Sequence, residues 1–216
     1  MSESIHFIAL HAPSGELFES AMRIYLDCFP ANERQPSEVV HERVRSGKSV
    51  FFAAVDQDEC VGMAMLWDFK GIPFVLLDYL AIREDRQGTG IGSGFFRFLS
   101  EEISRRRKRI VIEVEHPGSG TNTAQRRRRI RFYLDNGAGI LQGVPYLLPP
   151  LDGTTATDML LMISPAKDCP VMRHDEIREL IMRLYLELYR RDGQDSLLNS
   201  FISQIPESAI VNNLQP

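Results

Sequence analysis

Residues 87–92, with the sequence Gln-Gly-Thr-Gly-Ile-Gly, concentrate glycine at one point of the chain. Glycine allows sharp turns and a close approach of the backbone to a ligand. The apolar run 74–82 before this segment predicts a buried strand, and Phe95, Leu99 and Ile103 after it recur every four residues, which predicts an amphipathic helix. The first N–H groups of a helix lack internal partners, and the helix dipole favours negative charge there. The segment therefore predicts an anion site, with phosphate as the simplest ligand.

The spacing of these glycines distinguishes between kinds of phosphate loop. A Walker A loop needs a lysine directly after its last glycine, and no lysine follows here. The dinucleotide pattern Gly-x-Gly-x-x-Gly also fails, because Ser93 or Phe95 occupies the position of its last glycine. The pattern that remains is Gln-x-x-Gly-x-Gly, at Gln87, Gly90 and Gly92. A glycine-rich turn that only caps a helix is the structural alternative.

This pattern resembles the pyrophosphate loop of the GNAT superfamily of N-acetyltransferases, which use acetyl-CoA. The resemblance implies that backbone N–H groups of the loop bind the pyrophosphate, and that the end of the preceding strand pairs its backbone with the pantetheine arm. The loop residues are then Gln87, Gly88, Thr89, Gly90, Ile91 and Gly92. The strand residues are Leu80, Ala81 and Ile82. Acetyl-CoA is the implied cosubstrate, and scattered histidines without ligand spacing predict no metal.

A second match lies at residues 129–138, with the sequence Arg-Ile-Arg-Phe-Tyr-Leu-Asp-Asn-Gly-Ala. It resembles the late helix of the same family, which ends in Tyr-x-x-Asn-Gly before a strand. The resemblance implies that Tyr133 donates a proton to the departing thiolate, whereas packing of Phe132 and Tyr133 in the core is the alternative. The chain departs from the family at Arg126, where members often carry an asparagine that contacts the pantetheine arm. Arg126 also begins a run of four arginines, which predicts a solvated helix face.

Three carboxylates lie on the two predicted central strands, namely Asp78, Glu113 and Glu115. An alkylammonium with a pKa of about 10 is mostly protonated at neutral pH, so acetylation of an amine needs a base. A carboxylate can serve, directly or through a water, and burying a charge without purpose is costly. The alternatives are a hydrogen bond to a loop for Asp78, and a strand-end cap or an ion pair with a nearby arginine for the glutamates. The family places its base variably, so the resemblance does not choose among the three.

The resemblance places the acceptor pocket at Glu33, Arg34 and the loop around Tyr146, because loops that join helices commonly carry specificity. Ordinary surface is the alternative for each residue. The carboxylates favour a cationic small-molecule amine as the acceptor, with direct transfer from acetyl-CoA in a ternary complex. Acetylation of a protein or peptide amine is the second enzyme hypothesis. A catalytically silent module that senses acyl-CoA is a hypothesis from a different class.

The elements that would position these residues follow from hydrophobic periodicity and turn residues. Over residues 5–164 the predicted order is strand, helix, helix, three strands, helix, strand, helix and two strands, with hairpins that lead into one β-α-β crossover. Ser14 is the predicted cap of the first helix, and residues 144–155 are predicted to be a loop. The order matches the GNAT fold, an α/β (α+β layered) architecture with a mixed, mostly antiparallel central sheet and flanking helices.

Residues 165–216 lie outside the resemblance, so the predicted domains are an acetyltransferase domain at 1–164 and a helical extension at 165–216. Apolar residues at helical spacing predict a helix over 175–190 and a short one over 196–204. The apolar stripe of the longer helix must be buried. It either packs on its own domain or forms the interface of a homodimer.

The composition is typical of a soluble globular protein, with 44% hydrophobic and 25% charged residues. A formal net charge of −4 gives no pull toward nucleic acid, and no apolar run is long enough to span a membrane. Three cysteines without a Cys-x-x-Cys pair, and a start without signal-peptide features, predict a cytosolic (cytoplasmic) location. The expected partners are therefore acetyl-CoA and an amine, without nucleic acid or membrane.

Overall fold

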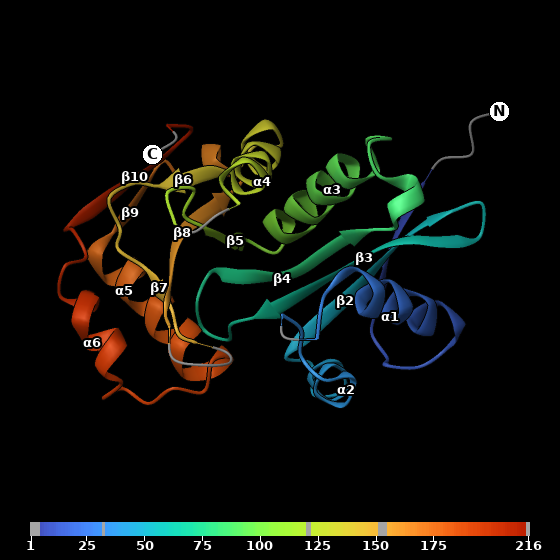
Figure 1. Ribbon diagram of the computed structural model, residues 1–216, viewed down its shortest axis with the longest axis horizontal. Coiled ribbons are helices and arrows are strands. Elements are labelled where there is room, and N and C mark those ends of the chain that lie inside the picture. Colours follow the sequence, from blue (N-terminus) through green and yellow to red (C-terminus); the bar gives the residue numbers. More distant parts are fainter. Residues whose placement is uncertain (1–4, 32, 120–121, 151–154, 215–216) are drawn as a thin grey trace. The chain divides into compact units, whose positions relative to one another are not determined.

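The computed structural model describes residues 5–31, 33–119, 122–150 and 155–214. The chain divides into two compact units, shown with their elements in Figure 1. The first unit comprises residues 1–70 and 75–106, and the second comprises residues 71–74 and 107–216. Each unit has its own sheet pairings and helices.

The first unit is an antiparallel sheet between two layers of helices. Its strands follow the order β1 (His6–Leu10), β2 (Ser49–Asp56), β3 (Glu59–Asp68) and β4 (Phe74–Ile82), of which only the first residue of β4 belongs to the second unit. The helices are α1 (Glu16–Cys28), α2 (Ser37–Arg45) and α3 (Ile91–Arg105), and the short 3-10 turn η1 (Glu84–Arg86) precedes α3. Figure 1 shows α1 and α2 on one face of this sheet and α3 on the other.

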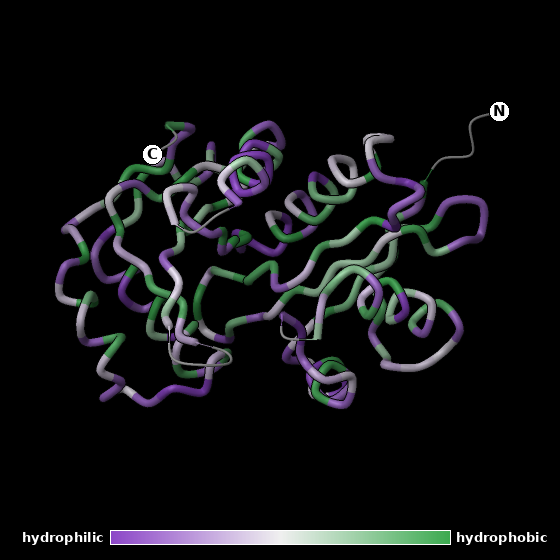
Figure 2. The backbone as a smooth tube through the Cα atoms, in the orientation of Figure 1, coloured by the Kyte–Doolittle hydropathy of each residue, from purple (hydrophilic) through white to green (hydrophobic). Residues whose placement is uncertain are grey.

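Both faces of this sheet are buried. Phe51, Met63 and Met65 belong to the core cluster beneath α1 and α2. The neighbouring Phe52 points to the opposite face, where its ring centroid lies 6.3 Å from that of Phe98 in α3. Because side chains alternate along a strand, a sheet covered on both faces needs near-continuous apolar strands. Figure 2 accordingly shows β2, β3 and β4 in mostly hydrophobic colours.

A β-bulge interrupts β4 at Asp78. Met65 of β3 pairs with Tyr79, but the next residue of β3 pairs with Leu77, so Asp78 is the extra residue. A bulge re-aims the side chains around it. Tyr79 lies in the core beneath α1 and α2, and Asp78 reaches Arg43 of α2. The bulge therefore directs two consecutive side chains of β4 toward the same pair of helices.

The second unit also has an antiparallel sheet. Its strands follow the order β5 (Arg109–Glu115), β8 (Thr157–Ser164), β6 (Gly139–Leu141), β10 (Ser208–Asn212) and β9 (Val171–Arg173), and β7 (Leu147–Leu148) pairs with β8. The helices are α4 (Thr123–Asp135), α5 (His174–Arg183) and α6 (Ser196–Ile202), with a 3-10 turn η2 (Ala166–Asp168). A π-helical turn, Leu184–Leu188, continues α5.

Several local predictions need correction. Ser14 does not cap the first helix, because Gly15 occupies the N-cap position and α1 begins at Glu16. The predicted loop 144–155 contains the two-residue strand β7, and its residues 151–154 lie outside the described residues. The predicted helix 175–190 changes to a π-helical turn at Leu184. The strand β7 depends on its pairing with β8, and the π-helical turn on a change of hydrogen-bond pattern, neither of which hydrophobic periodicity reports.

The C-terminal segment is more than a helical addition, because it contains β9 and β10. Val211 of β10 pairs with Leu141 of β6, so this segment extends the sheet of the second unit. The apolar stripe of α5 and the π-helical turn is 0% exposed in the single chain at Ile177, Leu180, Ile181 and Leu184. Packing within the chain is therefore confirmed for this stripe, and a homodimer would have to use another surface. The domain boundary at residue 164 stays a prediction.

Candidate functional site

The glycine-rich segment links η1 to α3 and holds glycine in conformations that other residues rarely adopt. Gly90 is the N-cap of α3, with φ 87° and ψ −7°, and Gly88 has φ 76°. The side-chain amide of Gln87 donates a hydrogen bond to the carbonyl of Ile82, at 3.0 Å. The hydroxyl of Thr89 donates to a carbonyl of η1, at 2.7 Å. These contacts attach the loop to the end of β4.

The N-terminus of α3 meets the requirements of a phosphate site. Within the described residues no side chain caps this helix, and its first turn carries no carboxylate. A Cβ atom built at Gly88 or Gly90 would meet no described atom within 4 Å, so open space lies beside the backbone. Bare N–H groups and the helix dipole place partial positive charge at this point. The loop therefore fits a phosphate or pyrophosphate group.

The strand residues of the predicted cosubstrate site lead directly into this loop. Leu80, Ala81 and Ile82 pair with β3 along one edge of β4. Ala81 is buried, and the side chains on either side of it are half-buried. The structure therefore brings the predicted strand end and the predicted phosphate loop together in the first unit, as the sequence predicts. The contact with a pantetheine arm stays a prediction.

Asp78 forms a buried ion pair in the first unit. Its Oδ2 atom lies 3.1 Å from Nη1 of Arg43, and the two side chains are 14% and 7% exposed. Burial raises the pKa of Asp78 to about 6, and the guanidinium of Arg43 opposes this rise. Arg43 also lies 4.9 Å from the ring centroid of Trp67, and its Nε has no hydrogen-bond partner among the described residues. Protonation of Asp78 would therefore leave a buried guanidinium without its counter-ion.

Glu113, in the second unit, receives a hydrogen bond on each carboxylate oxygen. The hydroxyl of Tyr146 donates to Oε1, and the hydroxyl of Tyr189 donates to Oε2 at 2.6 Å. Burial and the nearby Glu113 raise the pKa of Tyr146 well above its usual value, so this phenol stays neutral at neutral pH. Glu113 itself is half-buried. Both phenols fix the carboxylate in place without supplying a positive charge that would cancel its own.

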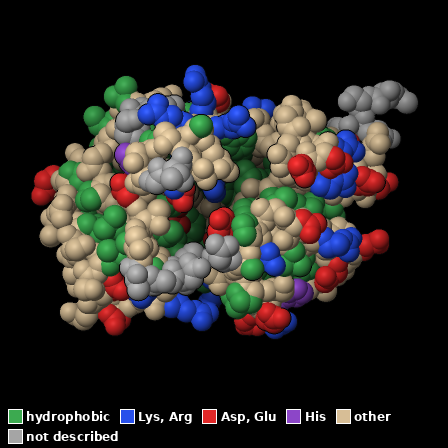
Figure 3. Space-filling view, viewed as in Figure 1, with side chains coloured by type: hydrophobic (Ala, Val, Ile, Leu, Met, Phe, Trp, Pro, Cys, Tyr) green, Lys and Arg blue, Asp and Glu red, His purple; other side chains and the backbone are tan. Residues whose placement is uncertain are grey.

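Glu115 follows two residues later and has a different kind of partner. Its Oε2 atom lies 2.5 Å from Nε of Arg126 in α4, and its side chain is 47% exposed. The ion pair that was the structural alternative for Glu115 is therefore present. The remaining arginines of the run, Arg127, Arg128 and Arg129, are exposed. Figure 3 shows basic side chains gathered over α4, which confirms the predicted solvated face.

Tyr133 is 4% exposed and lies on the buried side of α4. Its ring packs edge-on against Phe132, with 5.1 Å between the centroids. Its backbone carbonyl accepts hydrogen bonds from the N–H groups of Asn136 and Ala138, which closes the C-terminal end of the helix. The predicted helix motif is therefore present up to its glycine, and the proton-donor role of the hydroxyl stays a prediction.

The predicted acceptor residues lie in different units. In the first unit, Nη1 of Arg34 donates to the carbonyls of Leu26 and Phe29, at 3.1 and 2.5 Å, and so closes the end of α1. The backbone carbonyl of Glu33 accepts a 3.3 Å hydrogen bond from the hydroxyl of Tyr79. Tyr146, in the second unit, is 0% exposed, and its hydroxyl is bound to Glu113. A side chain so buried contacts the carboxylate rather than an open pocket.

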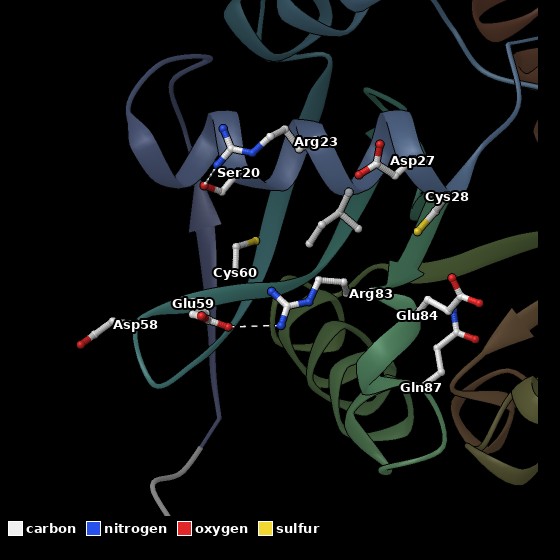
Figure 4. A pocket seen from close by; sticks show the side chains of 11 residues that line it. Ser20, Arg23, Asp27, Cys28, Asp58, Glu59, Cys60, Arg83, Glu84 and Gln87 are labelled. Atoms are coloured by element: carbon white, nitrogen blue, oxygen red, sulfur yellow. Dashed lines mark hydrogen bonds and ion pairs between the residues drawn. The ribbon is translucent and has the colours of Figure 1, made fainter.

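A cavity of about 750 Å³ lies beside Gln87 in the first unit (Figure 4). Its charged lining residues are Asp27, Asp58, Glu59, Glu84, Arg23 and Arg83. Arg83 forms an ion pair with Glu59, at 3.2 Å, so its positive charge is offset and the net charge of the lining is negative. Acidic walls repel phosphate, and none of the predicted catalytic residues is among the described residues that line this cavity. The charge of this lining therefore does not favour phosphate inside the cavity, and the phosphate loop stays a prediction.

Two residues of these networks are not predicted from the sequence. Arg43 lies between Val40 and Val44 on the buried face of α2, and a charge at such a position signals a buried partner. Tyr189 lies in the C-terminal segment, outside both motifs, and no sequence signal connects it to Glu113. Among the described residues no cluster of three or more histidine, cysteine or acidic side chains could hold a metal, and no helix could span a membrane.

A protein-family model matches the middle of the chain. Residues 47–137 match the model of an acetyltransferase (GNAT) domain. The matched range extends from the turn before β2 to the glycine that follows α4. It therefore includes the glycine-rich loop, the three carboxylates and Tyr133. A comparison with curated protein sequences finds no match.

Solved structures share the fold at low sequence identity. An acetyltransferase from Bacteroides thetaiotaomicron, assigned to the GNAT family, is 23% identical with a TM-score of 0.65, over 81% of this chain and 93% of that one. An aminoglycoside 6'-N-acetyltransferase in complex with coenzyme A is 20% identical with a TM-score of 0.58, over 73% and 95%. The ribosomal-protein-S18-alanine N-acetyltransferase from Escherichia coli is 16% identical with a TM-score of 0.52, over 74% and 92%. The predicted fold class, a mostly antiparallel central sheet with flanking helices, is confirmed.

Proposed function

We propose that this chain, whose residues 47–137 match the model of an acetyltransferase (GNAT) domain, transfers the acetyl group of acetyl-CoA to a primary amine. The match to an acetyltransferase domain supports acetyl transfer, and the amine acceptor is a further part of the proposal. The observation that carries the proposal is the N-terminus of α3. Gly90 is its N-cap, no described side chain caps it, and its first N–H groups can donate to a pyrophosphate. The backbone of residues 87–92 would bind the pyrophosphate, and that of residues 80–82 would pair with the pantetheine arm.

Glu113 is the base in this proposal. Proton uptake by Asp78 or Glu115 would leave Arg43 or Arg126 without its counter-ion, and for the buried Arg43 this is costly. Glu113 accepts a hydrogen bond from a neutral phenol on each carboxylate oxygen, and a neutral donor does not depend on the carboxylate for charge balance. Glu113 is also half-buried rather than enclosed, so a substrate ammonium or a water can reach it.

The reaction is a direct transfer in a ternary complex. Glu113 takes a proton from the ammonium, and the freed nitrogen attacks the thioester carbonyl carbon, so that a C–N bond forms as the C–S bond breaks. Tyr133 gives its phenolic proton to the departing sulfur and is reprotonated from the proton that the nitrogen loses. The products are an N-acetyl amine and the CoA thiol, with one proton released to solvent through Glu113.

A cationic small molecule is the proposed acceptor, because a half-buried carboxylate attracts an ammonium group. The fold itself admits more than one acceptor class, since the two named N-acetyltransferases that share it act on an aminoglycoside and on a ribosomal protein. A panel of small polyamines, aminoglycosides and peptides, assayed by release of CoA, separates the hypotheses. Turnover with peptides alone would favour the protein acceptor, and binding of acetyl-CoA without any turnover would favour the sensor.

We expect Tyr133→Phe to lower kcat by about 10- to 10³-fold, the range of general-acid catalysis. Phenylalanine keeps the buried ring and its contact with Phe132 but removes the proton. Acetyl-CoA affinity, measured by calorimetry, and the melting temperature should stay nearly unchanged. A fall in melting temperature with normal turnover per folded molecule would instead make the hydroxyl structural.

A cytosolic location and a homodimer remain part of the proposal. Scattered cysteines support the location, because a reducing compartment keeps thiols free. Light scattering on the full chain determines the oligomeric state. A mass twice that of the chain would support the homodimer, with an interface away from the buried stripe of α5.

A further inference from the structure

Glu113 receives both of its phenol hydrogen bonds from residues outside the matched domain. Tyr146 precedes β7, and Tyr189 follows the π-helical turn near the C-terminus. The family model ends at residue 137, so neither phenol belongs to the matched segment. The C-terminal segment therefore reaches the carboxylate that is proposed to deprotonate the amine.

The π-helical turn determines where Tyr189 points. The N–H of Tyr189 donates to the carbonyl of Leu184 five residues earlier, at 3.1 Å, in place of the usual four-residue bond. Such turns insert an extra residue into a helix and recur at functional sites. Tyr185 and Tyr189 are four residues apart and would share a helix face, yet their hydroxyls bind different groups. Tyr185 donates to the carbonyl of Leu147, and Tyr189 donates to Glu113.

The aromatic rings around these hydroxyls form one packed cluster. The ring of Tyr185 lies 6.4 Å from that of Tyr146, 6.3 Å from that of Tyr189 and 5.9 Å from that of Phe201. Tyr146 and Tyr185 are fully buried, and burial raises the pKa of Tyr185 as well. A packed cluster of this kind restricts the rotamers of its members. The two phenols therefore present their protons to Glu113 in a fixed geometry.

We propose that Tyr189 is a positioning residue of the acetyl transfer, which holds the Glu113 carboxylate in its charged form and in a fixed orientation. The inference rests on the proposed role of Glu113 as the base. Each oxygen of the Glu113 carboxylate accepts a hydrogen bond from one phenol, and an ionised carboxylate oxygen can accept more than one hydrogen bond. Hydrogen bonds to the charged form of a carboxylate favour that form.

The titratable groups around Glu113 come from several elements of the second unit. Tyr146 and Tyr189 contact it directly, and Tyr185 interacts with it electrostatically. Asp195, before α6, and Arg191 in turn act on Tyr185. Glu115, on the same strand, is neutralised by Arg126 of α4. The two phenols donate directly to the carboxylate, so their removal should act directly on Glu113.

We expect Tyr189→Phe to move the acid limb of the kcat/KM–pH profile upward by about one pH unit. The physical reason is that the charged form of Glu113 loses a donor, so its pKa rises. At a pH on this limb, kcat/KM should fall about tenfold, because one pKa unit changes the deprotonated fraction tenfold. The KM for acetyl-CoA should not change, since residues 80–82 and 87–92, and not Tyr189, are proposed to bind the cosubstrate.

The matched control is Tyr185→Phe, which removes a hydroxyl from the same cluster but one that is bound to a backbone carbonyl. It should lower the melting temperature and leave the pH profile in place. Tyr146→Phe removes the other donor and should move the limb in the same direction as Tyr189→Phe, which keeps the inference testable if one variant misfolds.

An unmoved limb in folded Tyr189→Phe, or equal movement in Tyr185→Phe, would overturn the inference. Glu113→Gln separates this failure from failure of the base assignment. If Glu113→Gln loses activity while Tyr189→Phe behaves as the unmodified protein, only the positioning role is wrong. If Glu113→Gln keeps full activity, the base assignment is wrong, and the positioning role is wrong with it.

Discussion

Gly90→Glu should weaken the binding of acetyl-CoA by about 10²-fold or more while the chain stays folded. Two unit charges 4 Å apart repel by about 4 kcal/mol at an effective dielectric of 20, and each 1.4 kcal/mol is a factor of ten in affinity. The expected loss of affinity is smaller than this repulsion energy alone would give, because solvent and salt screen charges at an exposed loop. The side chain would enter the open space beside Gly90, where the pyrophosphate is proposed to lie. Isothermal titration calorimetry measures the change.

Two controls separate repulsion from backbone strain, because Gly90 has a positive φ that costs any other residue energy. Gly90→Ala introduces the strain without the charge. Gly47→Glu introduces both at a glycine of the same unit with φ 67° and open space around it, away from the loop. We expect acetyl-CoA affinity to be retained in Gly47→Glu and reduced only modestly in Gly90→Ala. Unchanged affinity in folded Gly90→Glu would refute the assignment of the phosphate loop.

Glu113→Gln should lower kcat/KM by about 10²-fold or more, the scale of general-base catalysis. Glutamine keeps the size of the side chain and can still accept one phenol hydrogen bond on its oxygen, while its NH2 group can donate to the oxygen of the other phenol, but it cannot take a proton at neutral pH. The acid limb of the pH–rate profile should disappear with it, because that limb reports the base of the free enzyme. Stopped assays of CoA release across pH 5 to 9 provide the measurement.

The other carboxylates are the controls for Glu113. Asp78→Asn should cost about 3–5 kcal/mol of stability, because the buried Arg43 loses its counter-ion, while turnover per folded molecule is retained. Glu115→Gln should cost less stability than Asp78→Asn and leave turnover in place, because the Glu115 side chain is 47% exposed. If Asp78 were the base, Asp78→Asn would instead remove an acid limb near pH 6, the value to which burial raises its pKa. That result, with an active Glu113→Gln, would move the base to the first unit.

The glycine loop could be predicted from the sequence because its chemistry is local. Backbone N–H groups at a helix start need only the glycines and the helix that follows, both of which are adjacent in the chain. Gly90 accordingly occupies the left-handed N-cap of α3. The buried face of α3 could also be predicted from the sequence, since Phe95, Leu99 and Ile103 repeat at helical spacing and are buried.

The surroundings of the carboxylates could not be predicted, because they depend on residues distant in sequence. Asp78 is re-aimed by a bulge that arises only when β4 pairs with β3. Glu113 and Glu115 alternate with apolar residues as one predicted pair, yet an arginine of α4 neutralises one and phenols from the C-terminal half hold the other. A π-helical turn, which periodicity does not reveal, brings Tyr189 into this network.

The strands of the C-terminal segment could not be predicted for the same reason. Its helices were predicted from apolar spacing, but β9 and β10 are short strands whose sequences carry little alternation. Val211 and its neighbour Asn212 are recognisable as strand residues only through their pairing with Leu141 and Ile140 of β6. Strand propensity depends mostly on such neighbours, so short strands are rarely evident from sequence alone.

Incubation of the full chain with acetyl-CoA and a panel of amines, followed by mass spectrometry of the amine and titration of free CoA thiol, tests the central claim most directly. The proposed function predicts one CoA thiol for each N-acetylated amine, with release of CoA that depends on the amine and is lost in Glu113→Gln. Saturable binding of acetyl-CoA with no amine-dependent release of CoA, for any small-molecule or peptide amine, would contradict the claim and leave an acyl-CoA sensor in its place.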